Sequence, residues 1–453
     1  MFIRRLISIT VLVALARVLR APGVVGPFSP DAPTPLLLGF LLIGAYLAGA
    51  LAADLGLPRI TGYLLGGLLF GPSGMGLITT GELEALGLID DVAIALIAFS
   101  AGAELKLREL RSQGRVIGSI LSLEMVTVFV SVAGLILLLR GSFPLTTGRP
   151  LADAVVIAMV FGSVAIANSP SVAVAVINET RSRGPVTSTI LGVTVLKDVA
   201  VIVLFAVMVS TAQTMLQGSG AGGWELGRRL AWEIGGSIAL GCLVGWLVSL
   251  YLHRWKAQKI LFILGVAFLL THIAAVLHLE ILLTSLATGL FVENVSEREA
   301  EPFVRAVEAN ALPFYALFFS LAGAGIHLDF LLSLWPLVLL LVAVRAAAIW
   351  LGTRAGASLG GAGEAVRKHA WTGFVSQAGV TLGMVTIAER AFPAWGEEMK
   401  ALFVAMVAFH ELVGPVLLQR GLVAAGETGL RDDPEREPGV ISPEEVEGTE
   451  VGA

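Results

Sequence analysis

The stretch Val164-Ala165-Ile166-Ala167-Asn168-Ser169-Pro170-Ser171-Val172 places amide, hydroxyl and proline residues in the middle of an otherwise apolar segment, residues 151–177. Proline has no backbone N–H to donate and disfavours helical backbone at the preceding residue, so a helix through this segment must break near Ser169. Inside a bilayer, unwound backbone is tolerated only where it is buried in protein or lines a water-filled cavity. The stretch therefore predicts a broken membrane-spanning helix at a polar site.

The composition around this stretch is that of a membrane protein. Of 453 residues, 56% are apolar and 14% are charged, and the mean hydropathy is +0.85. Soluble domains carry about 25% charged residues. We expect one all-α polytopic domain over residues 34–423, with the lipid bilayer as its solvent and no nucleic-acid partner. Cys242 is the only cysteine, which excludes a disulfide framework and a cysteine-based metal site.

Apolar stretches long enough to cross a hydrocarbon core of about 30 Å recur through residues 34–423. They predict thirteen spans, at residues 34–53, 57–79, 86–105, 115–139, 151–177, 185–211, 228–252, 258–276, 278–293, 310–327, 329–352, 367–390 and 396–423.

The two ends of the chain differ from this domain. Residues 1–33 contain an apolar run behind Arg4 and Arg5, which is typical either of a cleaved export signal or of a fourteenth span. Residues 424–453 hold nine acidic residues against two arginines and no aromatic residue, so we expect a disordered acidic tail. We expect no attached nucleotide-binding regulatory domain after residue 423.

The charges between the spans predict the orientation. One set of alternate loops holds sixteen lysines and arginines, and the opposite set holds six. Because cytoplasmic loops carry the excess of positive charge, we expect a multi-pass protein of the cell (inner) membrane with a cytoplasmic C-terminus.

An internal repeat emerges when the chain is split around the span at 228–252. Residues 99–105 resemble residues 319–325, and residues 66–70 resemble residues 287–291. Six spans on each side of one linker span make the two halves inverted in topology, an architecture typical of transporters with a site near the midplane. The alternative is that small apolar residues look alike in any membrane protein.

The counterpart of the broken span in the second half is Phe374-Val375-Ser376-Gln377-Ala378-Gly379-Val380-Thr381-Leu382. Ser376, Gln377 and Gly379 again bring polar groups and a glycine to mid-span. Two crossing discontinuous helices are therefore expected. A pair of packing kinks, with the polar side chains bonding between helices, is the alternative reading.

Ionisable pairs stand at matching places in the sixth span of each half, Lys197-Asp198 and His410-Glu411. An isolated charge at the bilayer centre costs from about 3 to over 10 kcal/mol, so such groups must be paired, hydrated or neutralised. Asp198 is the candidate carrier, binding a monovalent cation when ionised and a proton when neutral. A structural contact between Lys197 and Asp198 is the alternative.

Two further charges lie inside spans, Glu124 and Arg345. Arg345 has apolar neighbours in sequence and is suited to neutralise the carbonyl ends of broken helices. Glu124 can either join this cluster or extend to the interface. Glu280 and His278, near a span end, are expected to be interfacial.

At these residues the chain resembles the monovalent cation:proton antiporters, in the branch of the sodium/proton exchangers and the membrane part of potassium-efflux antiporters. The residues that carry the resemblance are Leu57-Pro58-Arg59-Ile60-Thr61-Gly62-Tyr63 with the glycine-rich run to Pro72, Asn168-Ser169-Pro170, Lys197-Asp198 and Ser376-Gln377-Ala378-Gly379-Val380.

The resemblance implies a homodimer, an elevator-type cycle without a cofactor, and roles by position. Asp198 would be the obligatory carboxylate, Asn168 and Ser169 would lie where one broken helix crosses the other, and Arg345 would face that crossing. The family commonly has Asp-Asp or Asn-Asp at the ionisable pair, and Lys197 departs from both.

The hypothesis is secondary antiport of sodium or potassium against protons. The alternatives are a gated potassium or cation channel and a transport-impaired relative. An enzyme is not expected, because His410-Glu411 and His369 lack the helical spacing of metal ligands. Carboxylate, amide and hydroxyl oxygens do not choose between sodium, potassium and lithium.

Overall fold

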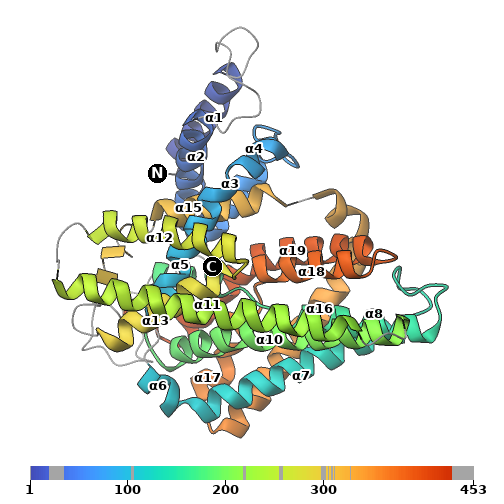
Figure 1. Cartoon of the computed structure of the whole chain (residues 1–453). Helices are drawn as coiled ribbons and strands as arrows, with labels where there is room; N and C mark the ends of the chain where they lie inside the picture. Colours follow the sequence, from blue (N-terminus) through green and yellow to red (C-terminus); the bar gives the residue numbers. More distant parts are fainter. Residues whose placement is uncertain are drawn as a thin grey trace.

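A computed structural model of the whole chain describes residues 2–19, 35–103, 107–217, 221–254, 259–296, 312–326 and 328–430, together with residues 303, 304, 306, 307 and 310. Regular secondary structure in these residues is helical throughout, as Figure 1 shows. The fold is therefore all-α, as predicted.

The first half of the chain contributes α1 (Phe2–Leu19), α2 (Pro35–Asp54), α3 (Arg59–Phe70), α4 (Thr80–Ala85), α5 (Gly87–Ala103), α6 (Leu107–Ser112), α7 (Gly114–Leu138), α8 (Leu151–Ala165), α9 (Pro170–Glu179) and α10 (Pro185–Gln217). After the linker helix α11 (Ala221–Arg254), the second half contributes α12 (Lys259–Leu277), α13 (Ile281–Val295), α15 (Leu312–Ala324), α16 (Leu328–Gly360), α17 (Glu364–His369), the 3₁₀ helix η1 (Ala370–Phe374), α18 (Gly379–Ala391) and α19 (Gly396–Ala424).

Each of the thirteen predicted spans coincides with a helix or with a broken pair of helices. Within the described residues, seven helices are long and apolar enough to cross a membrane, and shorter apolar helices accompany them. The polytopic architecture predicted from hydropathy is confirmed.

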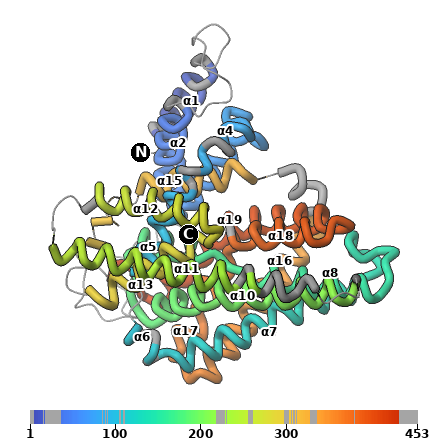
Figure 2. Tube along the Cα trace, in the orientation of Figure 1, coloured from blue at the N-terminus to red at the C-terminus, as the bar shows by residue number. Residues whose placement is uncertain are grey.

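The helices form two groups, which meet where α9 packs on α5, where α19 packs on α3, and through the linker helix α11, which packs on α10 and α13. We call the first group the core bundle; it comprises α7 to α10 and α16 to α19 and contains both broken helices. The second group, the panel, comprises α2, α3, α5, α12, α13 and α15. In Figure 2 the orange and red helices α16, α18 and α19 lie beside the teal and green helices α7, α8 and α10, so the core bundle draws on both halves of the chain.

The inverted repeat is visible in matching close contacts within the panel. Helix α3 packs on α15, and α5 packs on α13, so the second span of each half meets the third span of the other. At each contact a glycine lets two backbones touch. A Cβ atom would lie 2.0 Å from a carbonyl oxygen at Gly67 (Ser320), Gly102 (Leu286) and Gly289 (Phe99), and 2.1 Å at Gly323 (Leu64).

Helix α1 runs antiparallel to α2 at one edge of the molecule (Figure 1). Arg5 forms an ion pair of 2.7 Å with Asp54 and also donates to the carbonyl oxygen of Ala50. Residues 1 and 20–33 of this segment lie outside the described residues, and the choice between a signal and an extra span stays a prediction.

The first residues after α19, placed by sequence in the disordered tail, are folded. Glu427 is only 1% exposed, and its carboxylate accepts hydrogen bonds from Val186 N (2.7 Å), Thr187 N (2.8 Å) and Thr187 Oγ1 (2.7 Å) at the start of α10. The amide of Gly429 donates to the carbonyl of Thr180 at 3.0 Å. The expected boundary at residue 424 is thus too early, because unpaired N–H groups at a helix N-terminus bind this carboxylate. Residues 431–453 lie outside the described residues.

Candidate functional site

The two broken helices cross in the middle of the core bundle. Pro170 occupies the first position of α9, and the hydroxyl of the preceding Ser169 accepts from Val172 N at 3.3 Å as its N-cap. The second break separates η1 from α18. At the crossing the amide of Ser169 donates to the carbonyl of Ser376 at 2.9 Å, so the breaks are bonded through their backbones.

Arg345 of α16 joins the carbonyl ends that these breaks leave open. Its guanidinium donates to Ala165 O (2.7 Å) and Ala167 O (2.6 Å) from the first break, and to Val375 O (2.7 Å) from the second. The side chain is fully buried. Because the carbonyl end of a helix carries partial negative charge, one permanent cation stabilises both broken helices at once.

Lys197 of α10 is paired with Glu124 of α7, and not with its sequence neighbour. The Lys197 Nζ atom lies 2.7 Å from Oε1 of Glu124, and both side chains are 0% exposed. The ammonium also lies 5.6 Å from the ring centroid of Phe374. The two opposite charges of this buried ion pair cancel, so the pair adds no net charge near the helix crossing.

Asp198 is left without such a partner. The residue is 6% exposed, and its Oδ2 atom has no hydrogen-bond partner among the described residues. Asn168 Nδ2 donates to Thr194 Oγ1 at 3.2 Å. Thr194 lies four residues before Asp198 and therefore on the same face of α10, which brings the first break to the face that carries the carboxylate.

Several other buried polar atoms near the crossing have no hydrogen-bond partner within the described part of the chain: Asn168 Oδ1, both polar atoms of the Gln377 amide, and Thr381 Oγ1. Leaving a buried acceptor unpaired costs about 1–3 kcal/mol. Oxygen atoms of carbonyl, hydroxyl and carboxylate groups are the ones that replace the hydration shell of a monovalent cation. The chemistry of the crossing therefore suits such a cation as cargo.

The ionisable pair in the second half does not reproduce this arrangement. His410 is buried, and its Nε2 atom lies 3.4 Å from Nη1 of Arg345. Its neighbour Glu411 is 5% exposed. No group of three or more His, Cys, Asp or Glu side chains that could hold a metal ion occurs in the part of the chain that the structure describes.

Glu280, which the sequence predicts to be interfacial, is a partly buried residue at the turn between α12 and α13. It is the N-cap of α13: its side chain accepts from Leu283 N, and its own amide donates to Ser237 Oγ at 3.0 Å. Its charge interacts with that of Asp198. Helix α13 has only 15 residues, fewer than the about 20 needed to cross the hydrocarbon core. The residue at its start therefore need not reach the membrane surface.

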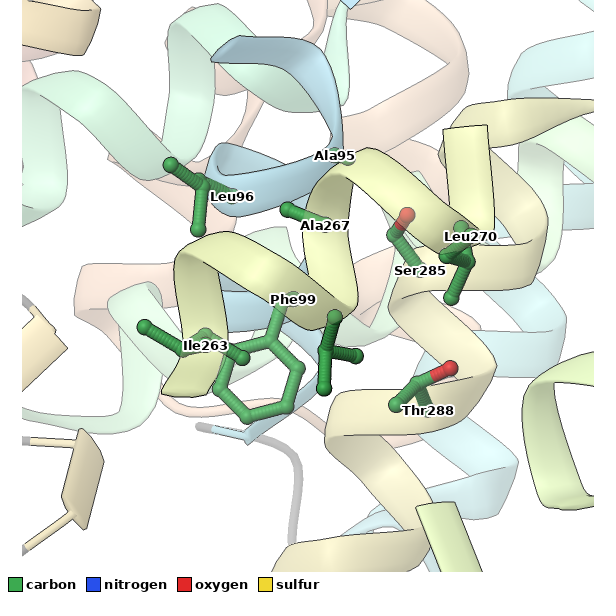
Figure 3. Close-up of a pocket in the computed structure, with 9 residues that line it drawn as sticks. Ala95, Leu96, Phe99, Ile263, Ala267, Leu270, Ser285 and Thr288 are labelled. Carbon is green, nitrogen blue, oxygen red and sulfur yellow. The ribbon is translucent and has the colours of Figure 1, made fainter. Parts of the chain in front are cut away.

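A small pocket in the panel lies apart from these groups. Figure 3 shows it between α5, α12 and α13, lined by side chains such as Phe99, Ile263 and Thr288. Its lining is almost entirely apolar and includes no ionisable side chain. This pocket is a packing feature of the panel and is not part of the helix crossing.

Comparison with known proteins gives the context of this geometry. The family described as "Sodium/hydrogen exchanger, transmembrane" matches residues 40–423. The glutathione-regulated potassium-efflux system protein KefC of Salmonella typhi is 27% identical over 429 residues, which cover 90% of this chain and 64% of the relative. The Na(+)/H(+)-K(+) antiporter GerN of Bacillus cereus is 28% identical over 176 residues, which cover 38% of this chain and 41% of the relative. The matches thus span less than two thirds of either curated relative.

The structure is also similar to solved ones. The sodium proton antiporter MjNhaP1 of Methanocaldococcus jannaschii at pH 8 superposes with a TM-score of 0.61 at 17% identity, over 88% of this chain and 98% of that chain. The structure of the same protein from an electron-microscopy map gives a TM-score of 0.60. The likeness is one of fold.

Proposed function

Because the chain belongs to the sodium/hydrogen exchanger family, whose transmembrane region matches residues 40–423, we propose that it is a secondary antiporter of a monovalent cation, sodium or potassium, against protons. The observation that carries the proposal is the buried carboxylate of Asp198, which has an unpaired oxygen on the face of α10 that meets the helix crossing. The printed names of the relatives, which refer to sodium, protons and potassium, support both cations as candidates.

Competition for one carboxylate couples the two fluxes. Ionised Asp198 binds the cation together with the oxygens of the crossing, and neutral Asp198 has bound a proton instead. In both loaded states the site carries no net charge. An empty, ionised Asp198 would cost several kcal/mol to move through the apolar region, so the unloaded domain does not change sides and the gradients do not leak.

The moving part in this proposal is the core bundle, which carries every residue of the crossing. It slides against the panel in an elevator-type cycle, and the site faces one side of the membrane and then the other. We further propose that the panel forms a homodimer and that the C-terminus is cytoplasmic. The excess of positive charge in one set of loops supports that orientation.

The charge balance supports an exchange of one cation for one proton. Lys197 and Glu124 neutralise each other, and Arg345 is bound by backbone carbonyls. Asp198 is then the group that changes its bound ion. One monovalent cation replaces one proton, and no net charge crosses the membrane.

The proposal is tested by reconstituting the protein in sealed proteoliposomes. An imposed sodium or potassium gradient should drive protons, and an imposed pH gradient should drive the cation in the opposite direction. Both fluxes should saturate with concentration. Single-channel currents, or a cation flux that is independent of the pH gradient, would favour a channel and contradict the antiporter.

A further inference from the structure

The turn between α12 and α13 carries a carboxylate at the depth of Asp198. Successive spans alternate in direction, so α10 begins and α13 ends at the same face of the membrane. Asp198 lies thirteen residues after Pro185, about 20 Å along α10, and Glu280 precedes the 15-residue α13, about 22 Å from its end. The two acids are therefore at similar depth, on the two sides of the boundary between core bundle and panel.

The carboxylate of Glu280 is held in place by its surroundings. Ser237 of α11 accepts a hydrogen bond from the Glu280 amide, and the Glu280 side chain caps α13. The turn is tight, with His278 in the left-handed region at φ 54°. Glu280 is thus a fixed charge on the panel side, and the charged groups that interact with it are Asp198 of α10 and Glu233 of α11.

Two observations indicate that this pair serves a ligand. Asp198 is 6% exposed with an unpaired Oδ2 atom, because the cation beside it, Lys197, is bound by Glu124. A second acid, Glu280, lies at similar depth on the panel side. Two acids that interact inside a membrane repel each other unless a proton or a cation lies between them or on one of them. Glu233 lies on α11, four residues before Ser237. It is a third acid, after Asp198 and Glu280, and it lies nearer to the membrane face at which α12 ends.

We propose that Glu280 is a second carboxylate of the transport pathway, which exchanges the cation or the proton with Asp198 when the site faces the side of the membrane at which α12 ends. In this step a proton leaves one carboxylate as the cation arrives, and the net charge of the two acids and their ligands is unchanged. The inference rests on the proposed antiport but adds a residue on the panel that the helix crossing does not contain.

The test compares Glu280→Gln with wild type in proteoliposomes loaded with sodium or potassium. Glutamine keeps an acceptor oxygen for the cap of α13 and removes the charge. We expect the KM for the cation to rise about tenfold or more and the pH profile of exchange to shift, with little change in thermal stability. Glu280→Ser, which caps the helix through its hydroxyl, is the second uncharged variant and should behave in the same way.

The matched control is Glu82→Gln. Like Glu280, Glu82 is a capping carboxylate; it accepts from Thr79 N at 2.8 Å and is 7% exposed, but it lies on α4 away from the crossing. Its substitution should leave the KM and the pH profile unchanged. A wild-type KM and pH profile in the folded Glu280 variants would overturn the inference while wild-type exchange still supports antiport. Absence of exchange in the wild-type protein would instead overturn the proposed function.

Discussion

The Nζ atom of Lys197 lies 2.7 Å from Oε1 of Glu124, and neither side chain has exposed surface. The lysine therefore points away from Asp198, its neighbour in sequence, and toward α7. Adjacent residues of a helix differ in direction by about 100°, which permits this separation. A lysine can thus stand beside the proposed carrier without neutralising it.

Removing one member of this pair should cost much of the protein's stability. In Glu124→Gln the ammonium of Lys197 remains buried without a counter-charge, and breaking a buried ion pair in this way costs about 3–5 kcal/mol. The thermal midpoint in detergent should fall strongly. The double variant Lys197→Met, Glu124→Leu should recover most of the loss, because it leaves no buried charge.

The matched control for that measurement is the pair of Lys400 and Glu389, which lie 2.8 Å apart, a similar distance, but are partly exposed. Such pairs contribute about 0–1 kcal/mol, so Glu389→Gln should change the midpoint little. Equal effects of Glu124→Gln and Glu389→Gln would contradict the account of the buried pair.

Exchange by the wild-type protein should be electroneutral. The paired charges of Lys197 and Glu124 leave Asp198 as the group that trades one proton for one monovalent cation. The exchange rate in proteoliposomes should therefore not depend on a membrane potential imposed with valinomycin and a potassium gradient, when sodium is the transported cation. A transient current on addition of sodium, proportional to the amount of protein, would contradict this stoichiometry.

Arg345→Lys should impair both stability and exchange. A lysine carries the charge but not the planar fork of donors, and it cannot bond carbonyls of both breaks together. Each lost hydrogen bond of a charged donor is worth about 1.5–3 kcal/mol. The control is Arg354→Lys on the same helix, where the exposed guanidinium lies over Trp350. Similar midpoints and rates for the two variants would contradict the proposed role of Arg345.

The hydrogen bonds between the Glu427 carboxylate and the start of α10 predict that the stability of the protein depends on pH. Burial raises the pKa of Glu427 above its ordinary value of 4.5, although hydrogen bonds from Thr187 and Val186 act in the opposite direction. The folded state then binds this proton more tightly than the unfolded chain. The contribution of this protonation to stability is complete below pH 4.5 and is lost as the pH rises through the raised pKa.

The measurement is the thermal midpoint of wild type minus that of Glu427→Gln, from about pH 4 to about pH 7. The difference should become smaller as the pH rises, because glutamine does not titrate. A difference that grows with pH would mean that the pKa of the buried carboxyl is lowered.

The fold could be predicted from sequence to a large extent. A membrane span needs about 20 consecutive apolar residues, which can be recognised without knowing the tertiary structure. Each of the thirteen spans predicted in this way coincides with helices of the structure. Pro170 marked the first break, because proline acts on the backbone locally. The inverted repeat followed from short matches, and the glycine contacts at Gly67 and Gly289 show why small residues recur in both halves.

The partners of the charges were harder to predict. The pairing of Lys197 with Glu124 depends on how α7 is rotated against α10, and hydropathy carries no information on that rotation when helices are apolar on every side. The depth of Glu280 was also hard to predict, because a span end usually lies at the interface but α13 has only 15 residues. Glu427 was assigned to a disordered tail because composition does not reveal one specific helix-capping contact.

The central claim is that the carboxylate of Asp198 carries both ions, and Asp198→Asn tests it most directly. Asparagine keeps the size of the side chain and removes the charge, so the fold should be retained. In sealed proteoliposomes, sodium- or potassium-dependent proton movement by the folded variant should fall to the level of protein-free vesicles. Exchange at the wild-type rate by folded Asp198→Asn would contradict the account.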